Sequence, residues 1–236
     1  MIKKTHRFIS DFNIRVGEYV ITDQELIHQT WDVLKLRSGE RIVLCDGNLN
    51  EGTATIIERN NSGIVTEIDE VSRNLNEPSR EVVLYCAILK SENFELACQK
   101  STEVGVSEIV PVITERTVKL NLRYDRLQKI IKEAAEQSGR GRVPKLNEAL
   151  SLEDAIKDAK RCAIRLCFDA SGSSLDDSRF KTQDSRSGAI FIGPEGGWSD
   201  NELKQFKENS FGIETLCPRV LRAETAATIG TYLAAR

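Results

Sequence analysis

The sequence predicts an α/β protein in which a small β-rich block precedes a larger region of alternating strands and helices. Three observations lead to this prediction. The first 70 residues contain short strand-like runs separated by turn signals, a polar break follows at residues 72–80, and strands and helices alternate from Glu81 onward. A chain of 236 residues has room for one large or two modest domains.

The β-rich block is expected to span residues 1–71 and to form a small barrel. Its predicted strands are residues 41–46, 52–58 and 64–68, with turn signals at Asp46-Gly47-Asn48 and Asn60-Asn61-Ser62-Gly63. One helix interrupts them, because Thr22-Asp23-Gln24-Glu25 has the pattern of a capping box and apolar residues follow it. Short strands at this spacing are typical of small barrels.

Residues 72–80 are interpreted as a linker, since Ser-Arg-Asn-Leu-Asn-Glu-Pro-Ser is rich in loop-forming residues. The second domain is then expected to span residues 81–236. Its predicted strands are residues 82–89, 108–114, 161–168, 189–192 and 213–216. Its predicted helices are residues 91–104, 124–138, 151–159, 199–209 and 224–235. Strands alternating with helices in this order predict a parallel sheet covered on both faces.

The composition is that of an ordinary globular protein, with 40% hydrophobic and 29% charged residues. No apolar run approaches the roughly 20 residues that cross a bilayer, and residues 1–7 are charged with no apolar run after them, unlike a secretory signal. We therefore expect a cytoplasmic protein without a membrane partner. The net charge of −3 argues against a protein that coats nucleic acid, although a local basic patch stays possible.

The six cysteines show no CxxC pair, and the chain has only two histidines. This shortage of ligands predicts that no metal is bound. Most of the cysteines lie in apolar, strand-like runs, so they are interpreted as small buried side chains in a reducing compartment.

Two connections from strand to helix have the composition of ligand-binding loops, and ligands of open α/β sheets bind at the carboxyl ends of strands. The first is Gly193-Pro194-Glu195-Gly196-Gly197-Trp198, whose three glycines would let the backbone approach a ligand closely. A tight structural turn would need fewer glycines. The second, residues 216–226, holds two arginines and a glutamate. A solvated loop before a helix explains this segment as well as a ligand site does.

Several common ligand-binding and catalytic motifs are missing from the sequence. It contains no GxxxxGK[ST] phosphate loop, no GxGxxG after the first strand of the α/β region and no GxSxG elbow. Their absence argues against a nucleoside triphosphatase, a conventional dinucleotide or methyl-donor site, and an α/β hydrolase.

A basic cluster, residues 136–145, follows the predicted helix that ends at Ser138 and includes Arg140, Arg142 and Lys145. It could complement the helix dipole or clamp a phosphate, since guanidinium groups bind phosphate oxygens bidentately. Lys90, Lys100 and Arg116 could extend the patch, although each alone has the character of a surface charge.

Four stretches, taken in order, make the chain resemble the bacterial 16S ribosomal RNA uridine-N3 methyltransferases of the SPOUT superfamily. They are residues 88–106, Glu136-Gln-Ser-Gly-Arg-Gly-Arg-Val-Pro144, Ile192-Gly-Pro-Glu-Gly-Gly197 and Pro218-Arg-Val-Leu-Arg-Ala-Glu-Thr-Ala226. The resemblance covers nearly the whole chain. Two departures are visible: Cys217 replaces a usual glycine, and Asp32 replaces a usual arginine.

The resemblance implies a PUA-like β-barrel for RNA binding, followed by a SPOUT α/β domain with a deep trefoil knot. It also implies a homodimer that takes a methyl group from S-adenosylmethionine and acts on 16S ribosomal RNA, with the small ribosomal subunit as its setting. Uridine N3 lies on the Watson–Crick edge, so the target base must be unpaired or flipped out.

The resemblance also assigns roles to residues. Arg222 would stabilise the developing negative charge on the uracil, and Glu224 would accept its proton or cap the last helix. The residues expected to bind the donor are Phe168, Gly193, Pro194, Glu195, Gly196, Gly197, Leu216, Cys217, Pro218, Val220, Leu221 and Thr225. The residues expected to bind RNA are Arg7, Lys90, Lys100, Arg140, Arg142 and Arg219.

Two rival interpretations stay open at this point. The same fold could methylate another RNA such as transfer RNA, although the barrel and the Glu-Gln-Ser-Gly-Arg segment argue against it. The chain could also be an RNA-binding assembly factor without turnover, although both candidate ligand loops are retained.

Overall fold

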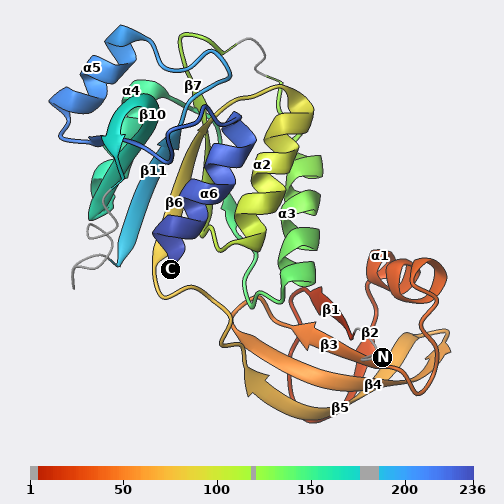
Figure 1. The fold of residues 1–236 in the computed structure, drawn as a ribbon. Helices are drawn as coiled ribbons and strands as arrows, with labels where there is room; N and C mark the ends of the chain where they lie inside the picture. The colour runs from red at the N-terminus through yellow and green to blue at the C-terminus, as the bar shows by residue number, and fades with distance from the viewer. Residues whose placement is uncertain (1–4, 118–120, 176–185) are drawn as a thin grey trace. The chain divides into compact units, whose positions relative to one another are not determined.

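The computed structural model describes residues 5–117, 121–175 and 186–236 and shows an α/β protein (Figure 1). Residues 1–4, which belong to the charged N-terminal segment, lie outside the described residues. Backbone contacts divide the chain into two units. The first is Met1–Glu77 with Ala135–Val143, and the second is Pro78–Ala134 with Pro144–Arg236. The basic residues 140 and 142 therefore group with the N-terminal unit, whereas the sequence placed them in the C-terminal domain.

The first unit is built on a five-stranded mixed sheet of order β1-β3-β4-β5-β2. Its strands are β1 (His6–Ile9), β2 (Gly17–Ile21), β3 (Arg41–Cys45), β4 (Asn50–Asn60) and β5 (Gly63–Arg73). The three predicted strands are confirmed, and β4 and β5 run longer than expected. β1 pairs parallel to β3, with Phe8 opposite Leu44, while the other pairs are antiparallel.

The helix of the first unit begins differently from the prediction. Asp23, not Thr22, is the N-cap residue of α1 (Gln24–Ile27), and its carboxylate accepts a hydrogen bond from the Leu26 amide at 2.7 Å. The helix continues as the π-helix η1 (His28–Val33). Leu26 and Ile27 pack into the core of the sheet, whose largest buried side chains include Phe8, Leu44 and Ile56.

The second unit contains a parallel sheet of order β12-β10-β11-β6-β7-β8, with β9 also paired to β7. Its strands are β6 (Glu81–Ala87), β7 (Glu108–Ile113), β8 (Lys145–Leu146), β9 (Leu150–Ser151), β10 (Ile164–Ser174), β11 (Ser187–Ile192) and β12 (Gly212–Thr215). Every pairing between them is parallel, as predicted. The two-residue strands β8 and β9 were not predicted, because they are too short to show a period.

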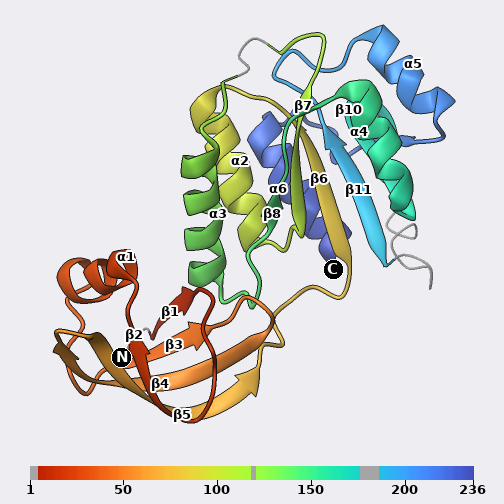
Figure 2. The ribbon, with the colours of Figure 1, turned by 180° about the vertical axis from the view of Figure 1, so that it is seen from behind.

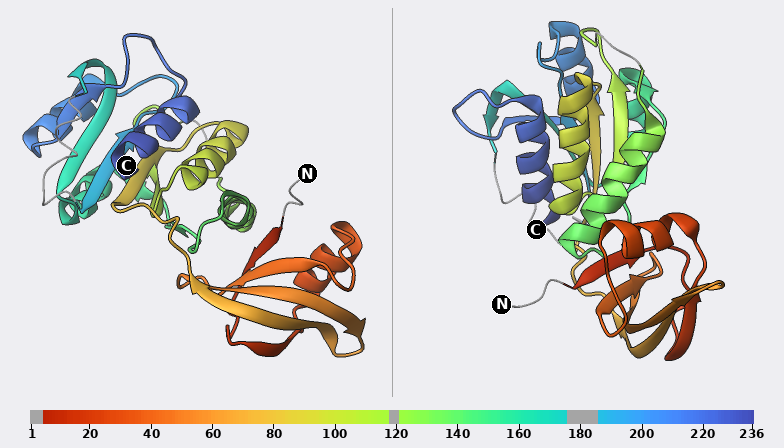
Figure 3. Two further views of the ribbon diagram at one scale, coloured as in Figure 1. Left: turned by 60° about the horizontal axis from the view of Figure 1, so that its bottom comes forward. Right: turned by 90° about the vertical axis from the view of Figure 1, so that its right-hand side faces the viewer.

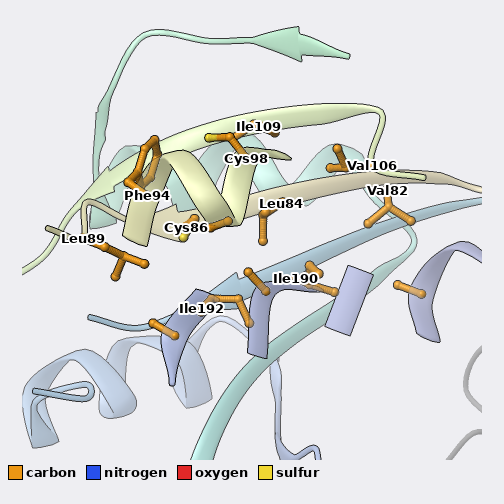
Figure 4. Close-up of a cluster of buried hydrophobic side chains, with 14 of the residues drawn as sticks. Val82, Leu84, Cys86, Leu89, Phe94, Cys98, Val106, Ile109, Ile190 and Ile192 are labelled. Atoms are coloured by element: carbon orange, nitrogen blue, oxygen red, sulfur yellow. The ribbon is translucent and has the colours of Figure 1, made fainter. Parts of the chain in front are cut away.

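Alternate residues of the central strand β6 point to opposite faces of the sheet. Val82, Leu84 and Cys86 pack with the helices α2, α3 and α6 (Figure 4). Val83 and Tyr85 pack with α4 and α5. The helices are α2 (Ser91–Glu103), α3 (Tyr124–Ser138), α4 (Leu152–Asp158), α5 (Asp200–Glu208) and α6 (Ala223–Ala235), with a short 3₁₀ turn η2 (Ala159–Arg161).

This arrangement confirms a sheet that is covered by helices on both faces (Figure 2). α2 and α6 pack against each other, and α6 also contacts β6 and β11 (Figure 3). The last helix of the chain therefore lies over the middle of the sheet, although the strand before it, β12, is at the edge.

The predicted helix ends are only partly confirmed. Ser151 and Ser199 are N-cap residues of α4 and α5, and Ser199 forms a full capping box with Glu202. Ser91 is instead the first residue of α2, after the N-cap Lys90, whose side chain makes no capping hydrogen bond. No helix within the described residues is long and apolar enough to cross a membrane.

Candidate functional site

A cavity of about 520 Å³ opens at the carboxyl ends of β10, β11 and β12. These strands are neighbours in the sheet, in the order β12-β10-β11, so the segments that follow them meet at one edge. Ten of the twelve residues predicted to bind the donor line this cavity, as do Arg219, Arg222 and Glu224. Pro218 and Thr225 are the two predicted donor residues that the lining does not include. The volume suits a small-molecule ligand.

The glycine loop, residues 193–198, is a tight turn that connects β11 to α5. The Gly197 amide donates to the Pro194 carbonyl at 2.8 Å, and Gly197 has a φ of +69°, which strains any other residue. A Cβ on Gly193 would lie 3.1 Å from the indole of Trp198. Glycine at this position therefore allows close packing of the backbone against the tryptophan ring.

Trp198 is the last residue of the glycine loop. Its side chain is 5% exposed, and its indole N–H donates to the Phe168 carbonyl at the end of the buried part of β10, at 3.2 Å. This bond links the loop after β11 to the neighbouring strand. Trp198 was not predicted as a site residue, although its place directly after the glycines was a usable signal.

Glu195 of the glycine loop points toward the start of α2 rather than staying free. Its carboxylate accepts hydrogen bonds from the Lys90 amide at 3.3 Å and from the Asn93 side chain at 3.2 Å. Burial opposes ionisation of Glu195, but hydrogen bonds from its own backbone, Asn93 and Lys90 outweigh it and lower its pKa. The loop is therefore fastened to the N-terminus of α2, where a negative charge is favoured.

The C-terminal loop, residues 216–222, forms the opposite wall of the cavity. The Thr215 hydroxyl donates to the Cys217 carbonyl at 3.0 Å, and the Cys217 thiol to the Arg219 carbonyl at 3.3 Å. Val220 is 89% exposed, although it is a large apolar residue. The loop ends at Arg222, the exposed N-cap residue of α6, whose carbonyl accepts from the Ala226 amide at 2.9 Å.

Cys217 is the one cysteine that is not buried, and all six are free. Burial raises the pKa of Cys45 to about 11 and that of Cys86 to about 12, so both stay protonated thiols near neutral pH. The prediction of buried cysteines therefore holds for five of the six. The exception, Cys217, lies in the cavity wall.

Glu224 is the most unusual polar group of the site. Its residue is 8% exposed and lines the cavity, and within the described chain its Oε2 atom has no hydrogen-bond partner. It does not cap α6, since Arg222 occupies the N-cap position. A buried carboxylate oxygen without a partner is costly, so it is a candidate contact for a ligand or substrate proton.

Asp169 and Ala170, after Phe168, also line the cavity, and so does Asn93 from α2. None of these three residues was predicted from the sequence. β10 extends past its predicted end at residue 168, and a register shift between Phe168 and Ser173 separates its two pairings with β12. Asp169 and Ala170 lie in this irregular segment and line the cavity. A bulge of this kind leaves no signal in the hydrophobic periodicity of a sequence.

Two of the residues predicted to bind RNA take part in partly buried ion pairs of the first unit. The Arg7 side chain donates to Glu51 at 2.6 Å and to the Cys45 sulfur at 2.9 Å. Arg140 is 4% exposed, and its guanidinium donates to Glu77 at 2.7 Å. Both guanidinium groups are therefore engaged in ion pairs within the first unit.

The other predicted RNA contacts lie at the surface. Lys90, Arg142 and Arg219 are exposed, and Arg219 also lines the cavity. Lys100 pairs with Glu103 on the same helix at 2.9 Å, which is a weak interaction at an exposed site. Lys90, Arg142 and Arg219 are thus the best placed of the six to meet phosphate groups. No group of three His, Cys, Asp or Glu side chains that could hold a metal occurs among the described residues.

Comparison with known proteins agrees with this geometry. Residues 76–234 match the RNA methyltransferase domain family. The chain is 36% identical, over 68% of its length and 72% of the relative's, to ribosomal RNA small subunit methyltransferase E of Mesomycoplasma hyopneumoniae. It is 31% identical to the protein of that name from Synechocystis, over 86% of this chain and 68% of that one.

A solved structure extends the match to both units. Ribosomal RNA small subunit methyltransferase E from Neisseria gonorrhoeae, bound to S-adenosyl methionine, superimposes with a TM-score of 0.87 and 30% identity. The match covers 97% of this chain and 95% of that one. The chain therefore belongs to the RNA methyltransferase family that includes these ribosomal RNA small subunit methyltransferase E proteins.

Proposed function

We propose that this chain is an S-adenosylmethionine-dependent methyltransferase that methylates N3 of a specific uridine in 16S ribosomal RNA. The observation that carries the proposal is the cavity at the ends of β10, β11 and β12, in a fold shared with a relative bound to S-adenosyl methionine. Such a substrate belongs to the small ribosomal subunit, so we also infer that the enzyme works in the cytoplasm.

The cavity suits a methyl donor for two reasons. Glycine at positions 193, 196 and 197 puts no side chain between the loop backbone and an adenosine, while Phe168 and Leu221 supply apolar walls. The partnerless oxygen of Glu224 supplies a negative group to a cationic ligand or an acceptor to a substrate proton. S-adenosylmethionine, when bound, supplies the methyl group and its positively charged sulfonium.

The chemistry requires that uridine N3 lose its proton before it becomes a good nucleophile. Arg222 is the N-cap residue of α6 and lines the cavity. There its fixed positive charge stabilises the uracil anion. Glu224, two residues later and buried, is placed to accept the proton from N3.

The RNA is held by exposed basic residues, and we assign this role to Lys90, Arg142 and Arg219, with Lys100 as a weaker contact. Arg7 and Arg140 contribute by keeping the first unit in shape. We further propose that the five-stranded sheet and α1 of this unit form a PUA-like barrel. The mixed order β1-β3-β4-β5-β2 and the buried apolar core beneath it support that assignment.

We also propose that the C-terminal end of the chain forms a deep trefoil knot. The support is the chain path: β12 lies at the sheet edge, while α6 returns to β6 and β11 in the middle. The segment 216–222 must therefore cross the neighbouring strand ends. A homodimer is proposed as well, because Ile229 and Tyr232 are apolar residues of α6 that stay 36% and 51% exposed.

The test is incubation of the enzyme and labelled donor with small ribosomal subunits from cells that lack the modification, followed by primer extension. N3-methyluridine cannot form its normal base pair, so we expect a reverse-transcriptase stop at one position of 16S RNA. Label found in transfer RNA and absent from the small subunit would contradict the proposal. Binding to the subunit with no label in any RNA would point to an assembly factor without turnover.

The cavity assignment predicts a specific effect of Gly193→Ala. The new Cβ would lie 3.1 Å from the Trp198 indole, so the ring or the loop must move. We expect the dissociation constant of S-adenosylmethionine to rise about tenfold, as measured by calorimetry. Gly188→Ala is the control on β11, the strand that leads into the loop, since the nearest neighbour of the new Cβ would be Arg80 at 4.0 Å. Equal affinities of the two variants would contradict the assignment.

A further inference from the structure

A short turn after β7, residues 114–117, lies against the glycine loop. The Thr117 amide donates to the Thr114 carbonyl at 3.1 Å, and the Thr114 amide to the Thr117 hydroxyl at 2.9 Å. These two bonds close the turn on itself. Thr114 is 7% exposed, so the turn starts from a buried and well-held position.

The turn is fastened to the start of α5. Oε1 of Glu202 accepts from the Glu115 amide at 2.9 Å, and Glu202 is 1% exposed. The Asn201 side chain donates to the Glu115 carboxylate at 2.9 Å. Hydrogen bonds from Asn201 and Ser199 lower the pKa of Glu115. Since α5 directly follows the glycine loop, the turn and the loop share one anchor.

Arg116 stands at the tip of this turn and reaches the outer side of the glycine loop. Its guanidinium donates to the Gly196 carbonyl and, at 3.4 Å, to the Gly197 carbonyl. A Cβ on Gly196 would lie 3.2 Å from Cδ of Arg116, so the arginine stem packs closely on the loop. Arg116 itself is not among the residues that line the cavity.

These contacts control the orientation of two peptide groups. In a trans peptide the carbonyl and the N–H point in opposite directions. Arg116 therefore holds the carbonyls of Gly196 and Gly197 outward while the Gly197 amide closes the turn on Pro194. A loop with three glycines has many conformations of similar energy, so an external cation that selects one of them reduces the entropy lost on ligand binding.

We propose that Arg116 is a positioning residue that preorganises the glycine loop for the methyl donor. This role rests on the proposed function, because it assumes that the loop binds S-adenosylmethionine. It replaces the interpretation of Arg116 as part of an RNA-binding patch. Arg116 acts through the loop, so it changes donor affinity and leaves the reacting groups in place.

The experiment compares Arg116→Ala and Arg116→Lys with the control Arg123→Ala. Arg123 is an exposed arginine that pairs with Glu95 of α2. Calorimetry with S-adenosylmethionine and S-adenosylhomocysteine gives the dissociation constants, and steady-state assays separate the KM of the donor, the KM of RNA and kcat. We expect Arg116→Ala to raise both dissociation constants and the donor KM about tenfold. At saturating donor, kcat and the RNA KM should stay within about twofold of wild type.

Arg116→Lys should recover part of the affinity, because one ammonium can still reach one carbonyl. Asn201→Ala loosens the turn at an exposed position without touching Arg116, and it should weaken donor binding to a smaller extent. This second variant keeps the test valid if Arg116→Ala folds poorly.

Unchanged donor affinity in a folded Arg116→Ala variant would overturn the role, and a raised RNA KM at constant donor affinity would return Arg116 to the RNA-binding patch. Wild-type protein that binds no donor would instead overturn the proposed function, and the role of Arg116 with it. The two failures are therefore distinguishable in one set of titrations.

Discussion

Replacement of Arg222 by alanine is expected to lower kcat by about two to three orders of magnitude while the affinity for S-adenosylmethionine stays close to that of wild type. Arg222 is the N-cap residue of α6 and lines the cavity, where we propose that its charge meets the uracil. Single-turnover assays with small ribosomal subunits and calorimetry with the donor alone provide the two measurements.

The pH dependence of the Arg222→Ala variant gives a second readout. If Arg222 stabilises the N3 anion, its removal raises the pKa of the bound uracil. The rate of the variant should then keep rising with pH beyond the point where the wild-type rate is constant, so the defect becomes smaller at high pH. A loss of donor binding in calorimetry, or a defect that is the same at every pH, would contradict this role. Arg219→Ala serves as the comparison, because it should raise the KM of RNA without this pH effect.

Glu77→Ala is expected to destabilise the first unit by about 3–5 kcal/mol, because it removes a partner from a buried guanidinium. The Arg140 side chain is 5% exposed, and Glu77 also accepts from the backbone amides of Gly141 and Arg142 at 3.0 and 3.2 Å. One substitution thus removes an ion pair and two backbone hydrogen bonds. Urea denaturation followed by Trp31 fluorescence measures the free energy of unfolding of this unit.

The matched control in the same unit is Arg41→Ala, which breaks the exposed pair between Arg41 and Asp69 at 3.6 Å. We expect that change to cost less than about 1 kcal/mol. The measurement is best made with Trp198→Phe as the background, since Trp198 belongs to the second unit and is the other tryptophan of the chain. Equal midpoints for Glu77→Ala and Arg41→Ala would show that the pair with Arg140 does not hold the unit together.

Hydrophobic periodicity predicted the α/β class and most elements correctly. α3 was expected at residues 124–138 and is observed as Tyr124–Ser138, because its apolar positions recur along one face. The buried strands β6 and β11 were predicted from continuous apolar runs, which are typical of parallel strands with both faces covered. Elements without a period, such as β8, β9 and the irregular end of β10, escaped prediction.

The assignment of the polar residues 72–80 to a linker illustrates a limit of composition. Asn74 in this segment is 4% exposed, and its amide donates to Glu51 and to the Gly139 carbonyl at 2.9 and 3.0 Å. A polar segment predicts a loop, but it does not show which distant segment will satisfy its hydrogen bonds. For the same reason, Arg7 and Arg140 looked like free cations before their carboxylate partners were visible.

The sequence by itself determined the parallel sheet and the two candidate ligand loops, because these depend on local composition at strand ends, and its resemblance to a known family supplied most of the residues that line the cavity. Only the tertiary structure decided which groups act on those loops. Asn93, Arg116 and Asp169 reach the site from other elements, and Glu224 becomes a buried carboxylate through the packing of α6. Such contacts join residues far apart in the chain, so they follow from the order β12-β10-β11-β6 and not from any local pattern.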